Sequence, residues 1–229
     1  MQSSITLSDR TKPLTLAVKD PLSALTHLIA AVCAALAGPF LIRHYSDAGA
    51  DGLQIFGALI FVFSMLLLYT ASTTYHTVVY AGRNNIFKKL DHMSIFVLIA
   101  GTYTPLCLTV LRDTCGPAFL AAIWGLAGVG ILFKFCWVTC PRWVSSVIYI
   151  TMGWLCLFIF PQLFHSLSLT GFLLILSGGI VYTLGGIIYA MKFSFFNSRH
   201  PYFGSHEIFH IFVMVGNLLH FIAIYACLV

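Results

Sequence analysis

Two histidines near the carboxyl end of the chain, His206 and His210, have the spacing of paired metal ligands. Residues four apart lie one turn apart on the same face of an α-helix, so both imidazoles can reach one ion. His76 adds a third imidazole if the fold brings its helix alongside. Three protein ligands and an open fourth position are the usual arrangement of a catalytic zinc. The pattern therefore predicts a Zn²⁺ site on His76, His206 and His210.

Two further polar residues are expected at the same site, in catalytic roles. Ser72 lies four residues before His76 and so on the same helix face. Its hydroxyl could hydrogen-bond a water on the metal or the carbonyl of a substrate. Asp91 could orient that water or accept its proton.

The composition places this chemistry inside a membrane. Of the 229 residues, 59% are hydrophobic and only 8% are charged, and the mean hydropathy is +0.94. Soluble domains carry about 25% charged residues, which excludes an ordinary soluble domain. The net charge of +5 does not indicate nucleic-acid binding, because the basic residues form no single stripe. The seven cysteines are scattered and indicate neither a disulfide framework nor a zinc ribbon.

Apolar runs of about 20 residues predict seven membrane-spanning helices in one all-α domain, residues 21–229, after a short tail, residues 1–20. Short polar links with turn-forming residues separate the runs, which excludes a barrel of alternating strands. The fifth run is the shortest. The expected spans are residues 22–42, 54–79, 92–111, 117–138, 144–160, 169–191 and 205–228.

The basic residues predict the orientation of these helices. Ten of the twelve Lys and Arg fall on one side, and only Arg43 and Arg112 fall on the other. Because basic loops stay in the cytoplasm, the amino terminus is expected to be cytoplasmic and the carboxyl terminus outside. We therefore predict a multi-pass protein of the plasma membrane. This topology brings His76, Asp91, His206 and His210 to one depth in the inner leaflet.

Other interpretations of the histidines were weighed. Residues 206–210 also read His-Glu-Ile-Phe-His, the zinc-protease signature with Glu207 as general base. That chemistry needs a further ligand downstream, and His220 lies ten residues, or about 15 Å, beyond His210 along the helix. A protease is therefore not favoured. Intramembrane histidine clusters also serve as proton relays. His27, His92 and His220 are interpreted as polar tethers between helices, with His27 near enough to support the ligands.

Three motifs resemble those of one family when taken together. They are Ser72-Thr-Thr-Tyr-His76, then Leu90-Asp91-His-Met-Ser with Ala100-Gly-Thr-Tyr-Thr-Pro105, then His206-Glu-Ile-Phe-His210. In this order they resemble the bacterial hemolysin III proteins, a branch of the progestin and adipoQ receptor family, from about residue 20 to the end. The resemblance implies a seven-helix fold with an intramembrane zinc on the three histidines. It also implies that Asp91 holds a water and that Ser72 supports the site.

The resemblance also implies a function. Its relation to the alkaline ceramidases suggests a metal-dependent hydrolase of a lipid amide, acting on membrane lipid at the inner leaflet. Two alternatives remain open. One is a non-enzymatic regulator or sensor of membrane composition, in which zinc is structural. The other is a cytolysin, as the name hemolysin implies.

Overall fold

The computed structural model describes residues 18–78, 84–191, 193–200 and 203–229, and this part of the chain contains helices and no strand. Seven spans in it are long and apolar enough to cross a membrane, which confirms the predicted all-α fold. The helices are α1 (Pro21–Asp47), α2 (Gly52–Thr77), α3 (Asn84–Thr109), α4 (Gly116–Cys136), α5 (Arg142–Gly153), the 3₁₀ helix η2 (Trp154–Ile159), α6 (Phe160–Ser166), α7 (Leu169–Met191), α8 (Ser194–Arg199) and α9 (Ser205–Cys227).

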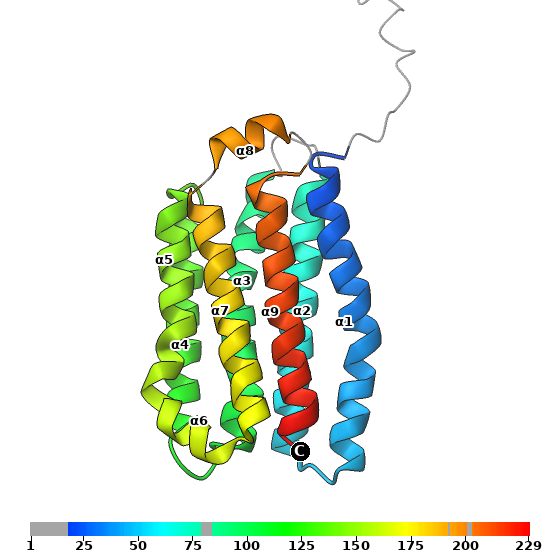
Figure 1. The fold of residues 1–229 in the computed structure, drawn as a ribbon, viewed down its shortest axis with the longest axis vertical. Helices are drawn as coiled ribbons and strands as arrows, with labels where there is room; N and C mark the ends of the chain where they lie inside the picture. The colour runs from blue at the N-terminus through cyan, green and yellow to red at the C-terminus, as the bar shows by residue number, and fades with distance from the viewer. Residues whose placement is uncertain (1–17, 79–83, 192, 201–202) are drawn as a thin grey trace, which may run out of the picture.

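The long helices run antiparallel to their neighbours in sequence and form one upright bundle (Figure 1). We name its two ends after the short helices that lie there. The α8 end holds the start of α1 and α9, and the α6 end holds the carboxyl terminus (Figure 1). The placement of the α8 end on the cytoplasmic side remains a prediction from the charge pattern.

Helix α3 lies at the centre of the bundle. Of its most apolar 18-residue window, 61% is buried, against 22–44% for the other six spans. Glycines allow α2 and α3 to approach each other closely. A Cβ atom on Gly57 would lie 3.1 Å from Cα of Pro105, and one on Gly101 would collide with Ser64. The packing therefore explains why glycine occurs at position 57 of α2 and at position 101 of α3.

The fifth span differs from the prediction. A single run over residues 144–160 was expected, but the span covers Arg142–Ser166 and is divided into α5, η2 and α6. The reason is a contact from another helix. The hydroxyl of Tyr103 in α3 donates to the carbonyl of Gly153 and accepts from the backbone N–H of Cys156 at 3.0 Å. This side chain replaces backbone partners where the helix breaks, so the chain continues as a 3₁₀ helix.

Two other details were not predicted. Helix α8 occupies the link before the last span, where no helix was expected. Lys134 lies in the last turn of α4 and is fully buried, although it was counted with the basic residues of the cytoplasmic side. The remaining predicted spans agree with the observed helices to within a few residues, except that α1 continues to Asp47 and α3 begins at Asn84. Residue Val79, the predicted end of the second span, lies outside the described residues.

Large apolar side chains cover the outer surface of the bundle. Phe40, Phe63 and Phe158 are 69%, 58% and 78% exposed. A monomeric soluble protein rarely presents such an extensive apolar surface, whereas lipid tails solvate it without cost. Together with the seven spans, this surface identifies a multi-pass membrane protein.

Two glycines of α4 provide a test of the packing between α4 and α3. A Cβ atom on Gly130 would overlap the ring of Phe96 in α3, whereas nothing lies within 4 Å of a Cβ atom on Gly128. We expect Gly130→Ala to destabilise the protein by about 1–3 kcal/mol through overpacking. Gly128→Ala should be neutral or stabilising by up to about 1 kcal/mol, because alanine favours the helix. Thermal unfolding of both variants in detergent measures the difference. Equal melting temperatures would contradict the packing.

Candidate metal centre

The three histidines of the predicted site meet near the α8 end. The ring centroid of His206 lies 4.9 Å from that of His76 and 4.5 Å from that of His210. The centroids of His76 and His210 are 5.2 Å apart. One ring nitrogen from each residue lies within 4.8 Å of the other two. His76 and His210 are each 2% exposed and His206 is partly exposed, so two of the three rings are shielded from solvent.

Local hydrogen bonds hold the two helix ends that carry these residues. The segment before α1 pairs with the end of α2, because the N–H of Asp20 donates to the carbonyl of His76 at 2.9 Å. At the start of α9, the carboxylate of Glu207 accepts from the N–H of Gly204 at 2.8 Å. The side-chain oxygen of Asn197 in α8 accepts from the N–H of Ser205, also at 2.8 Å. The first turn of α9 is therefore fixed immediately before His206.

Two of the histidines have partners on the side away from the cluster. Nδ1 of His76 lies 2.9 Å from a carboxylate oxygen of Asp20, and a carboxylate can only accept, so this nitrogen carries the hydrogen. Nδ1 of His210 lies 3.1 Å from the hydroxyl of Thr26, which already donates to the carbonyl of Ser23. That hydroxyl therefore accepts from His210. Both neutral rings are left with an unprotonated Nε2.

This arrangement fits a metal ion. Nε2 of His76 and Nε2 of His206 lie only 3.1 Å apart. Two lone pairs at this separation repel each other unless a proton or a cation lies between them. Nitrogen ligands about 2.0–2.1 Å from a tetrahedral Zn²⁺ would be separated by a similar distance. A ligand imidazole that donates its other N–H to a carboxylate or a hydroxyl is also the usual supporting arrangement around zinc.

Asp20 lies just before the first span, where its electrostatics can be described. Burial alone would raise the pKa of its carboxyl group. The hydrogen bond with His76 and the charge of Lys19, whose Nζ lies 3.2 Å away, outweigh this effect and lower the pKa below its ordinary value. Asp20 is therefore an anion next to a ligand ring. The sequence did not reveal this contact, because it joins residues that are 56 positions apart.

The other intramembrane histidines behave differently from one another. His220 is a polar tether between helices, as predicted, because its Nε2 lies 3.0 Å from the carbonyl of Ile175 in α7. The ring of His27 stacks on His210 with centroids 3.7 Å apart, and neither of its nitrogens has a hydrogen-bond partner in the described part of the chain. Nδ1 of His92 lies 3.2 Å from the carboxylate of Asp91. Glu207 caps α9 and contacts Ser23, so it does not join the cluster.

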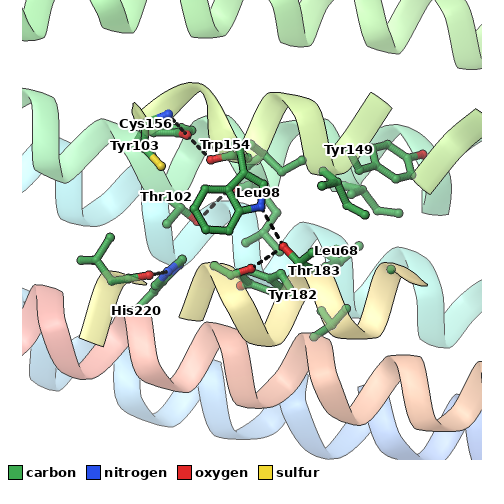
Figure 2. A pocket seen from close by; sticks show the side chains of 18 of the residues that line it. Leu68, Leu98, Thr102, Tyr103, Tyr149, Trp154, Cys156, Tyr182, Thr183 and His220 are labelled. Atoms are coloured by element: carbon green, nitrogen blue, oxygen red, sulfur yellow. Dashed lines mark hydrogen bonds between the residues drawn. The ribbon is translucent and has the colours of Figure 1, made fainter. Parts of the chain in front are cut away.

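An apolar cavity of about 170 Å³ extends along the bundle to this cluster. Leu163 and Phe172 line it at the α6 end, and Ser72, Asp91 and His210 line it near the α8 end. Figure 2 shows its middle portion, where Trp154, Thr183, Tyr103 and other side chains from several helices surround the space. Most of the polar side chains labelled there bond to backbone groups, as Thr102 does to the carbonyl of Leu98, and Trp154 donates to the hydroxyl of Thr183 at 2.8 Å.

The two residues predicted to assist catalysis both border this cavity. Ser72 is 1% exposed, and its hydroxyl has no hydrogen-bond partner among the described residues. Asp91 is 7% exposed. A buried hydroxyl without a partner costs about 1–3 kcal/mol, so its position at a cavity wall indicates room for a polar group there.

A second, polar cavity of about 300 Å³ lies at the α8 end. His76 and Glu207 line it, together with Lys88, Arg142 and Ser145. His92, Tyr189 and His206 line both cavities. The three-histidine cluster therefore lies where a polar space and an apolar space meet.

Metal analysis tests this centre. We expect purified protein to bind about one Zn²⁺ per chain, and His76→Ala or His206→Ala to abolish binding. Asp20→Asn should weaken zinc affinity about 10–100-fold, because it removes the anion that orients His76. His200→Ala, on the exposed end of α8, is the matched control and should bind normally. Zinc titration of chelator-treated protein, followed by elemental analysis, measures these values. A wild-type protein that takes up no zinc would contradict the assignment.

Comparisons with known proteins agree with this fold. A family model described as haemolysin-III related matches residues 16–221. The chain is 37% identical over 203 residues to the hemolysin-3 homolog of Bacillus subtilis (strain 168), covering 88% of this chain and 91% of that protein. It is 36% identical over 219 residues to hemolysin-3 of Bacillus cereus, covering 95% and 96%. On these matches, and with its seven apolar helices, the chain belongs to the haemolysin-III family.

Proposed function

We propose that the protein is a metal-dependent lipid hydrolase that cleaves an amide bond. One observation carries the proposal: a cluster of three imidazoles lies at the end of a buried apolar cavity. The apolar lining suits part of an acyl chain, and the scissile bond at its polar end would then lie beside the histidines. The charge pattern predicts that this end faces the cytoplasm, which would direct the enzyme to lipids of the inner leaflet.

The energetics of binding such a substrate differ from those of a soluble enzyme, which takes its substrate from water. An acyl chain that moves from the bilayer into the cavity passes from one apolar medium to another and gains little free energy. Selectivity must therefore come from cavity shape and from polar groups near the cluster. The unpartnered hydroxyl of Ser72 is one such group, because it can donate to a substrate carbonyl.

The proposed chemistry gives each residue one role. His76, His206 and His210 would hold a Zn²⁺ ion, which when bound supplies a Lewis acid and lowers the pKa of water. Asp91 would accept a proton from the attacking water and deliver it to the leaving amine. Ser72 would orient the carbonyl. The bond from water oxygen to the carbonyl carbon forms, the carbon–nitrogen bond breaks, and a fatty acid and an amine result.

Turnover measurements test these roles. We expect the reconstituted wild-type protein to release fatty acid from an amide-containing lipid extract, and His206→Ala to release none. Asp91→Asn should lower kcat by about 10²–10⁴-fold, the usual contribution of a general base. Ser72→Ala should have a smaller effect on kcat, and the His200→Ala control none. Full lipid-amidase activity in His206→Ala would rule out the mechanism.

The cavity can be tested separately from the cluster. Gly179 borders the apolar cavity, and nothing lies within 4 Å of a Cβ atom built on it. Gly179→Leu should therefore fill the cavity and reduce hydrolysis at least tenfold, while zinc content stays unchanged. Gly128→Leu is the control, because this position is exposed on α4 and also has free space. Equal activity of the two variants would show that the acyl chain binds elsewhere.

Two other functions make different predictions. A regulator with a structural zinc would lose thermal stability when the histidines are replaced, and would release no fatty acid from any lipid extract. The printed names of the relatives describe hemolysins. A cytolysin would release dye from loaded vesicles when protein is added from outside. The extensive apolar surface favours a permanent place in the host membrane over a soluble attacking form.

A further inference from the structure

The polar cavity at the α8 end contains positive charge that the proposed hydrolysis does not use. We propose that this cavity binds the phosphate group of an amphiphile, so that the lipid handled by the adjacent cluster carries a phosphorylated headgroup. The lipid's role as substrate rests on the proposed function, whereas the phosphate site rests on the geometry below.

The strongest sign is Lys134, which is 0% exposed at the end of α4. Its ammonium group donates to the hydroxyl of Ser145 at 2.5 Å and to the sulfur of Cys140 at 3.0 Å. Both acceptors line the polar cavity, and neither is a carboxylate. A buried ammonium without a counter-ion is costly, so an anion on the cavity side of these two residues would stabilise it.

Two other cations border the cavity directly. Lys88 from α3 and Arg142 from α5 both line the cavity. The guanidinium of Arg142 lies 5.1 Å from the ring centroid of Tyr189, which holds it beside a residue that lines both cavities. Lys88 and Arg142 thus approach the cavity from two helices, and Lys134 lies behind Cys140 and Ser145 in its wall. A phosphate, with several acceptor oxygens, suits such a set of donors.

Two acidic residues, Asp20 and Glu207, also line this cavity, but the acidic residues at this end are engaged with other partners. Asp20 contacts Lys19 and His76, Asp91 contacts His92, and Glu207 accepts from Ser23 and Gly204. In the described part of the chain, none forms an ion pair with Lys88, Lys134 or Arg142. Of the four other acidic residues of the chain, three lie toward the α6 end and one outside the described residues: Asp47, Asp51, Asp113 and Asp9.

Membrane topology does not account for this arrangement. The bias of basic residues toward cytoplasmic loops requires only hydrated charges near the membrane surface. Lys89 meets that description, because it is half-buried and packs its ammonium 4.4 Å from the ring centroid of Phe135, away from both cavities. Lys134 does not, because it is fully enclosed by protein.

The position of the site fits an amphiphile. His92, Tyr189 and His206 form the boundary between the two cavities. A phosphate in the polar cavity and an acyl chain in the apolar cavity would place the bonds between them beside the three imidazoles. The charged headgroup would then supply the selectivity that the acyl chain cannot.

A binding experiment tests the phosphate site without requiring turnover. Dioctanoyl phosphatidate and dioctanoylglycerol are titrated into the full-length protein in detergent, and tryptophan fluorescence reports binding. We expect the phosphatidate to bind at least tenfold more tightly. The double variant Lys88→Gln/Arg142→Gln should remove that preference, and so should Lys134→Met. The matched variant Lys89→Gln should keep it.

The outcomes separate this proposal from the hydrolase. If Lys134→Met does not fold, the double variant at the cavity lining decides. Unchanged phosphatidate affinity in the double variant would overturn the site, even in an active hydrolase. Loss of preference there would support it, even in a chain without hydrolase activity. Competition by inorganic phosphate at the same concentration would support the site with free phosphate as its ligand; the absence of competition would identify the lipid headgroup.

Discussion

A polar group inside an apolar bundle has no water to bond, and this constraint organises the structure. Groups with partners hold the helices together: Asn217 bonds Tyr69 and Tyr182 at 2.6 Å each and so joins α2, α7 and α9. Groups without full compensation lie elsewhere. The hydroxyl of Ser72 lies at a cavity wall, and the ammonium of Lys134 bonds to two residues that line the polar cavity, Cys140 and Ser145. The cost of burying a polar group without a partner therefore favours the hydrogen bonds that join the helices. Polar groups that remain uncompensated indicate the candidate sites.

Much of the fold was predictable because membrane insertion is decided segment by segment. Each span must hydrogen-bond its own backbone polar groups, so hydropathy alone indicated seven helices. The break in the fifth span could not be predicted in this way, since it depends on Tyr103, some fifty residues away. The burial of Lys134 was missed for a related reason. A lysine at a helix end ordinarily reaches water, and only the packing of α5 against α4 shows that this one cannot.

The candidate site was predictable to the extent that its residues are close in sequence or share a depth. His206 and His210 are neighbours on one helix face, and the predicted topology brought His76 to their level. Asp20 and Thr26 were missed, because their contacts with the ligand rings cross between helices. A carboxylate beside the start of a span, where a hydrated residue is ordinary, carries no signal of its own. Stacking of His27 on His210 was equally invisible to spacing rules.

The meeting of the two cavities at His206 has a consequence for lipid traffic. From the α8 end inward, the interior changes from polar to apolar, as one leaflet of a bilayer does from its surface to its midplane. A lipid from that leaflet would enter sideways with its own orientation preserved, so no flip-flop step is required. After the proposed cleavage, the tail would diffuse back into the leaflet while the polar fragment would leave toward the aqueous phase. Two products would then have two separate exits.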